Sequence, residues 1–273
     1  MSAASPSVPA SVPPPPSPST PLPPTAPPTR PRVGEIRDYG TVRKESVDTD
    51  RWTAHGTVKV TGDVNLGQGT LVGMVSVGGK LAATGLAYHG TLDVGGVMDV
   101  RGTFSGSGAL RAGLTLHAVD ADLKGTVRVL GSTSVDRALT VRGSFSAPSL
   151  AVGKLTLHGE AQVPGDIVAH SVSARLTADS ALGPIRAPSV DLRAKLPNLV
   201  EKVLGRRVTV TVQRVEAEEV TLEAVDVKFV HAPKITLGRD AHITEYEGTI
   251  VRRHPSSRVG FESKSRPPYG LWR

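Results

Sequence analysis

The chain has 273 residues, of which only ten are aromatic, while 29 are glycine and 22 are proline. It contains no cysteine, which excludes disulfide bonds and thiolate metal sites. The net charge of +7 is carried by the ends, because residues 33–250 hold 24 basic and 24 acidic side chains. Residues 251–273 hold six basic side chains against a single acid. Attraction to nucleic acid or anionic lipid is therefore expected chiefly from the C-terminal end.

Thirteen of the prolines lie within residues 1–31, in a stretch without apolar periodicity. Proline fixes φ and donates no backbone hydrogen bond, so residues 1–40 are predicted to form a disordered tail, partly in polyproline II conformation. We favour a spacer over a ligand for proline-binding modules. The N-terminus lacks the basic start and apolar run of a signal peptide or membrane anchor, and we therefore expect an intracellular protein.

Residues 41–195 contain glycines separated by five or six residues. Three such steps lead from Gly56 to Gly73 and from Gly113 to Gly131, a repeat that fits three short strands and three bends. Apolar and polar residues alternate between the glycines, which predicts strands. The expected inward residues include Val75, Val77, Leu92, Val94, Phe104, Leu114, Leu116 and Phe145.

Two folds could bury such strands. Antiparallel hairpins require two-residue turn sequences such as Asn-Gly at every second bend, and these are scarce. A parallel β-solenoid instead turns at each glycine, where positive φ or close approach of two backbones is tolerated only by Gly. The even spacing therefore predicts an all-β fold, a three-sided parallel β-helix with about 17–18 residues per coil.

The rhythm is interrupted at residues 196–207, which are predicted to form a short helical or loop insertion. Strand patterning returns over 208–250 as a second block of coils, and residues 251–273 form a basic, flexible tail. The apolar side of the insertion and parts of the tail are candidates for contact with a membrane or a partner. These residues are Leu199, Val200, Val203, Leu204, Arg252, Arg253, Phe261 and Trp272.

The sequence offers few groups for catalysis. Its eight histidines are widely spaced and form no local metal motif, and His158 and His170 are expected near corners as exposed polar residues. The pair Asp120 and Asp122, like the acids at 216, 218 and 219, invites comparison with β-helical carbohydrate-active enzymes, but these need long loops to form a cleft. Hexapeptide-repeat acyltransferases keep a strict six-residue step, unlike this chain. We therefore expect no enzyme activity, no cofactor and no metal.

A solenoid without a cleft still has two ends that expose unpaired strand edges and an apolar cross-section. If these ends are uncapped, identical bodies can stack and continue the sheet without nucleotide. Filament formation is therefore the leading hypothesis. The residues expected at this polymer interface are Val58, Val60, Val64 and Leu66 in the first coils and Ile235, Leu237, Ile243 and Ile250 in the last.

The coils "GTVKVTGDVNLGQG" and "GTLDVGGVMDVRG", with a proline-rich arm before them and a basic tail after them, resemble the bactofilins, a family of polymer-forming cytoskeletal proteins. The later stretch from "LPNLVEKVLGRR" to "HITEYEGTI" is similar to extended prokaryotic, including archaeal, members. The resemblance implies a right-handed β-helix, nucleotide-free nonpolar filaments joined through the helix ends, and a scaffold role at the cytoplasmic side of the membrane. The apolar and basic N-terminal segment that attaches many members to the membrane has no counterpart in "MSAASPSVPA".

The sequence thus predicts a cytoplasmic scaffold whose partner is a second copy of itself. A homologous subunit and the inner face of the cell membrane are further candidate partners, and nucleic acid is not favoured. Two alternatives remain open. One is a β-helical carbohydrate-active enzyme or acyltransferase. The other is a membrane or nucleic-acid adaptor that acts through the C-terminal tail, whose binding should weaken with added salt.

Overall fold

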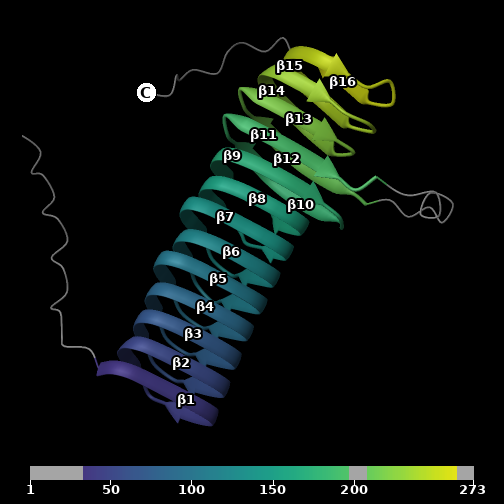
Figure 1. Ribbon diagram of the computed structural model, residues 1–273. Coiled ribbons are helices and arrows are strands. Elements are labelled where there is room, and N and C mark those ends of the chain that lie inside the picture. The colour runs from purple at the N-terminus through teal and green to yellow at the C-terminus, as the bar shows by residue number, and fades with distance from the viewer. Residues whose placement is uncertain (1–32, 197–207, 263–273) are drawn as a thin grey trace, which may run out of the picture. The chain divides into compact units, whose positions relative to one another are not determined.

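The structure, a computed structural model, describes residues 33–196 and 208–262, and these residues contain strands and no helix. The strands form one parallel sheet whose order follows the chain almost throughout, so that successive coils stack into a β-solenoid of about 13 turns (Figure 1). The all-β, parallel coiled fold expected from the glycine spacing is confirmed. In the described part of the chain, no helix is long and apolar enough to cross a membrane.

The first block of the solenoid consists of eight long strands, each covering most of a coil. They are β1 (Val33–Lys44), β2 (Val47–Val60), β3 (Val64–Val77), β4 (Leu81–Val94), β5 (Met98–Ala112), β6 (Leu116–Val129), β7 (Thr133–Ser146) and β8 (Leu150–Val163).

The second block has shorter strands and reaches further than the sequence analysis predicted. Its members are β9 (Ile167–Leu176), β10 (Ser180–Arg186), β11 (Ser189–Ala194), β12 (Val210–Glu216), β13 (Glu219–Glu223), β14 (Asp226–Leu237), β15 (His242–Arg253) and β16 (Arg258–Glu262). Two boundaries were therefore wrong: β1 already begins at residue 33, within the expected tail, and coils continue to residue 262, beyond the expected end at 250.

Each coil of the first block has three sides with two inward residues on each. In β3 the buried positions are 64 and 66, then 69 and 71, then 75 and 77, and polar or exposed residues lie between them. Corners fall near Gly67, at Gly73 and over residues 78–80, which pass to the next strand. Because the coil above and below repeats this pattern, the inward side chains form continuous columns through the core.

Two neighbouring columns of the second side run through the whole solenoid. We name them the Trp52 column and the Tyr88 column. The Trp52 column comprises Ile36, Trp52, Gly69, Leu86, Phe104, Ala121, Leu139, Leu155, Val172, Val190, Val220, Ile235 and Ile250. The Tyr88 column comprises Asp38, Ala54, Leu71, Tyr88, Gly106, Leu123, Val141, Leu157, Ala174, Leu192, Leu222, Leu237 and Arg253.

Along these columns each large aromatic residue is followed by a small one in the next coil. Trp52 pairs with Gly69 and Tyr88 with Gly106, so each of these aromatic residues has a glycine as its partner in the next coil. A Cβ at Gly106 would overlap the ring of Tyr88, and close packing therefore requires the missing side chain. The hydroxyl of Tyr88 is buried without a hydrogen-bond partner in the described structure, and burial raises its pKa to about 12.

One corner of each coil is a stacked ladder of glycines at positive φ, from Gly40 through Gly108 to Gly159. A Cβ at Gly108 would overlap the carbonyl oxygen of Gly90 in the coil beneath, so both the conformation and the space exclude a side chain. The glycines of the other two corners have ordinary φ and are needed for close approach alone. The predicted corners are confirmed, whereas Leu114, predicted to point inward, is 56% exposed beside one of them.

The interruption in the glycine rhythm is an insertion into a single coil. Ser180 of β10 pairs with Val210 of β12, on the far side of the insertion, so the sheet continues past it. Beyond it the coils tighten, because Thr211 already pairs with Asp226, a shorter sequence step than any in the first block. Residues 197–207 of the insertion lie outside the described structure.

Candidate functional site

The two ends of the solenoid are the places where the regular packing stops. In the sheet order β1 is the first strand and β16 the last. Strand β1 pairs with β2 alone among the described strands, so the other edge of Val33–Lys44 has no strand partner there. At the opposite end β16 covers only His242–Tyr246 of β15, and Gly248–Arg253 have no described strand above them. Within residues 33–196 and 208–262, each end therefore presents about one coil of open strand edge.

The N-terminal end places charged side chains in the core columns. Asp38 takes an inward position, is only 9% exposed, and accepts a hydrogen bond from Trp52 Nε1 at 2.8 Å. Lys44, inward on the next side, places its Nζ 3.2 Å from the other carboxylate oxygen of Asp38. Ile36 and Val42 lie beside them, half-buried against the core. This face is thus apolar with one buried ion pair across it.

The C-terminal end carries the complementary features. Ile250 ends the Trp52 column and is half-buried, with Val251 next to it 65% exposed on the outer surface. Arg253 ends the Tyr88 column, and its Nη2 donates to the carbonyl oxygen of Ser257 at 3.2 Å. Val259 of β16 is half-buried over Ile243. A cation therefore stands at this end in the same column that carries an anion at the other end.

Most of the predicted interface residues lie inside the solenoid. The sequence analysis placed the first coil too late, so its four N-terminal candidates lie in β2 and β3 beneath β1, and its choice of Ile235 and Leu237 fell on β14 beneath β15. Seven of the eight candidates are no more than 1% exposed, and only Ile250 lies at an open face. The seven core residues are Val58, Val60, Val64, Leu66, Ile235, Leu237 and Ile243.

The sequence analysis missed Ile36, Asp38, Val42 and Lys44 at the N-terminal end. A signal was present, because the step from Gly40 to Gly56 is nearly the same as the step from Gly56 to Gly73 and so continues the corner spacing by one coil. Among the candidates for membrane or partner contact, Arg252, Arg253 and Phe261 are exposed, Phe261 by 81%. Leu199, Val200, Val203, Leu204 and Trp272 lie outside the described residues.

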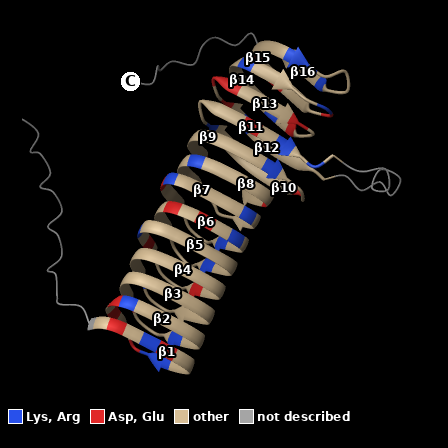
Figure 2. Cartoon of the chain, viewed as in Figure 1, with Lys and Arg blue, Asp and Glu red and all other residues tan. Residues whose placement is uncertain are grey.

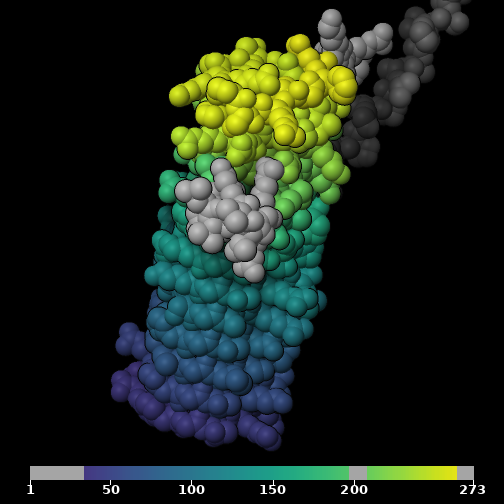
Figure 3. Space-filling view, turned by 90° about the vertical axis from the view of Figure 1, so that its right-hand side faces the viewer, coloured from purple at the N-terminus to yellow at the C-terminus, as the bar shows by residue number. Residues whose placement is uncertain are grey.

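The candidates for chemistry on the flanks are dispersed or paired. Asp120 forms an ion pair with Arg137, and Asp122 with Arg142 at 2.9 Å. Glu216 forms ion pairs with Arg214 of its own coil and with Arg186 of the neighbouring coil. Within residues 33–196 and 208–262, no three His, Asp or Glu side chains come together as a metal site would require. The coils form a closely packed flank in the view of Figure 3.

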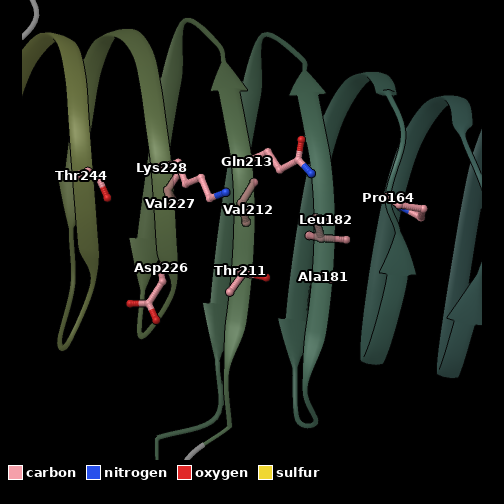
Figure 4. Close-up of a pocket in the computed structure, with 10 residues that line it drawn as sticks. All are labelled: Pro164, Ala181, Leu182, Thr211, Val212, Gln213, Asp226, Val227, Lys228 and Thr244. Atoms are coloured by element: carbon pink, nitrogen blue, oxygen red, sulfur yellow. The ribbon is translucent and has the colours of Figure 1, made fainter.

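A groove of about 270 Å³ lies on the flank of the described coils, along the third side of the second block. Leu182, Val212 and Val227, whose side chains are buried, are among the residues that line it, together with Gln213 and Lys228 (Figure 4). Pro164, Ala181, Thr211, Asp226 and Thr244 complete its lining. It is shallow and open, and its few polar groups do not converge on a point.

An outward column next to the glycine ladder gathers cations that are far apart in sequence. Lys124, Arg142, Arg175 and Arg193, with the imidazole of His158 between Arg142 and Arg175, occupy equivalent positions on successive coils, so basic side chains are stacked in register. Figure 2 shows that Lys and Arg segments recur on successive coils of the solenoid. The sequence analysis, which assigned the positive charge to the ends, did not detect this column because each member is a full coil away from the next.

Comparison of the chain with family models, with curated proteins and with solved structures found no match.

Proposed function

We propose that the protein is a structural scaffold without catalytic activity, whose solenoids associate end to end into filaments that need no nucleotide. The observation that carries the proposal is that both terminal coils present an open strand edge and half-buried apolar residues, Ile36 and Val42 at one end and Ile250 and Val259 at the other. The proposal rests on these coils and not on the bactofilin resemblance, which no comparison supports.

The energetics of such a contact are those of the solenoid itself. Adding a coil to a coil pairs backbone N–H and C=O groups and removes apolar side chains from water, at roughly 25 cal/mol per Å² of apolar surface. Open edges of parallel sheet are ready templates for pairing with another chain, and proteins that do not use them usually cover them. Because each coil is stabilised mainly by its neighbours, a second copy can act as the next coil.

The proposal is tested by negative-stain electron microscopy of the full chain without nucleotide, with variants that touch the two sides of β15. Ile250→Lys places a charge inside the open end and should abolish filaments. The matched control Val251→Lys alters the adjacent outward residue and should leave them intact. Circular dichroism should show the same strand content in both variants. A full chain that stays single at high concentration, or filaments that survive Ile250→Lys, would contradict the proposal.

A further inference from the structure

We propose that the filament is polar: the C-terminal coil of one copy receives the N-terminal coil of the next, with Ile250 against Ile36 and Arg253 against Asp38. This inference rests on the proposed function, since it names the partner face of each end. It departs from the nonpolar filaments implied by the bactofilin resemblance, and it follows from three features of the end coils.

The first feature is the register of the core columns. Ile36 and Ile250 are the two ends of the Trp52 column, and Asp38 and Arg253 are the two ends of the Tyr88 column. When a second copy continues the solenoid, each column continues as well. An apolar residue then meets an apolar residue, and a carboxylate meets a guanidinium, in adjacent columns of one side. Charge-assisted pairing of this kind is stronger in a low-dielectric interior than in water.

The second feature is the length of the terminal coils. Val42 pairs with Val58 at one end and Tyr246 with Glu262 at the other, and these two pairs span equal steps in the sequence. Coils from β2 to β6 are longer, by one position in the pair Val47 with Val64 and by two in the pair Leu86 with Phe104. Where the lengths of neighbouring coils differ the register shifts, as it does within the pairing of β4 with β5. At the junction Ile250 and Arg253 lie three residues apart, with Val251 as a bulge, and Ile36 and Asp38 lie two apart, so the contact would repeat the register shift already present between β14 and β15.

The third feature is what the opposite arrangement would bury. In a head-to-head contact the strands run antiparallel, so one side of the triangular coil meets itself and the other two meet each other. If the second side meets itself, Ile36 opposes Asp38. If it meets the third side, Ile36 opposes Lys44 and Asp38 opposes Val42. If the third side meets itself, Val42 opposes Lys44. Each alternative sets a charge against an apolar residue and gives Asp38 no arginine in its column, which costs free energy; head to tail, only Lys44 faces an apolar residue, Val259, and Asp38 faces Arg253.

The head-to-tail arrangement also accommodates Lys44. This residue occupies the same inward position on the third side as Val259 does in β16. Its methylene stem can pack against the valine while its ammonium group stays beside Asp38, where it already lies at 3.2 Å. The carboxylate of Asp38 then has the Trp52 indole, Lys44 and Arg253 around it, and no charged group of this face is left without an opposite charge.

Disulfide cross-linking of the full chain tests the arrangement, because the sequence has no cysteine to interfere. Adjacent parallel rungs lie roughly 4.8 Å apart, within the Cα separation that a disulfide spans. Ile36→Cys and Ile250→Cys are prepared as separate variants with tags of different mass. On oxidation, their mixture should yield a covalent dimer containing one of each. The doubly substituted chain should yield a ladder of covalent oligomers. Thr126 is exposed in the middle of the solenoid and serves as the control site. Thr126→Cys, mixed with either of the two variants, should not cross-link.

The outcomes separate the two proposals. Filaments in which one variant cross-links to a second copy of itself, while no dimer containing one of each variant forms, would show a head-to-head or tail-to-tail contact. The scaffold proposal would then stand and the polarity would fall. Filaments without any cross-link would likewise overturn the register. If the unsubstituted chain forms no filament and none of the mixtures cross-links, both proposals fail.

Discussion

The middle of the solenoid and its two end coils use the same inward positions in different ways. In the middle, as in β3 to β8, every position of the two core columns described above holds an apolar residue or glycine, and each is covered by a coil on both sides. At the ends the same columns finish in Asp38 and Arg253. This difference shows that the geometry of a coil alone does not require an apolar residue at an inward position. An apolar residue is required where a further coil covers the position, and in the proposed assembly the charge at each end selects the coil that covers it.

The largest contrast is expected from truncating the same column in both regions. Phe104→Ala removes a fully buried ring from the middle and should lower the free energy of unfolding by about 3–5 kcal/mol. Ile36→Ala, in the same column but half-buried at the end, should cost less than about 2 kcal/mol in the unassembled protein. Urea unfolding at low protein concentration measures both. Equal losses would show that the end coil is as tightly covered as the middle.

A second contrast comes from the glycine ladder. Gly108→Ala forces a side chain into positive φ and into the neighbouring backbone, and should cost about 3 kcal/mol or more. Gly40 has the same kind of φ but nothing within 4 Å of its absent side chain, so Gly40→Ala should cost only about 1–2 kcal/mol. Thermal and urea unfolding compare the two. A mild effect at Gly108 would mean that the ladder tolerates a shift of the coils.

The tyrosines of the two regions should respond differently to alkaline pH. The pKa of Tyr88 is raised to about 12 by burial, so its neutral form stabilises the fold below the unfolded pKa near 10. This contribution, up to roughly 2 kcal/mol, should be lost as the pH rises from about 10 to about 12. Tyr88→Phe should abolish that loss. Tyr39→Phe, which removes a hydroxyl from a tyrosine that is 65% exposed at the N-terminal end, is the matched control.

The charge at the C-terminal end should control assembly rather than folding. Arg253→Glu sets two acids against each other across the proposed junction and should raise the concentration needed for filaments by about 30-fold. Arg252→Glu makes the same change of charge at the neighbouring exposed residue and should change the concentration needed for filaments little. Light scattering against protein concentration measures this threshold. Equal increases in the threshold concentration for the two variants would show that the effect comes from net charge alone.

The smallest effect is expected where like charges stack on the flank. Arg175 lies between His158 and Arg193 in the outward cation column. Replacing it by threonine relieves repulsion from Arg193 on the adjoining rung and favours the strand, so Arg175→Thr should stabilise the fold by a few tenths of a kcal/mol. The stabilisation should shrink at high salt. A loss of stability would show that the column is held by contacts other than charge.

The middle of the fold could be predicted from the sequence because each inward residue there is covered twice and must be apolar. Alternation such as Leu92 and Val94 and the regular corner glycines are direct consequences of that constraint. The ends could not be found in the same way. A coil covered on one side tolerates Asp38 and Lys44 in core positions, which breaks the apolar pattern and moved the expected start to residue 41. Trp52 and Tyr88 were also missed as core residues, since only the register shows the glycines opposite them.

The central claim is that the ends join head to tail, and the axial repeat of the filament tests it most directly. About 13 coils at roughly 4.8 Å give a subunit length of roughly 60 Å. Electron microscopy of filaments of the full chain should show that repeat, with all subunits pointing in one direction. A repeat twice as long would reveal copies that alternate in direction, and a chain that forms no filament under any condition would contradict the account altogether.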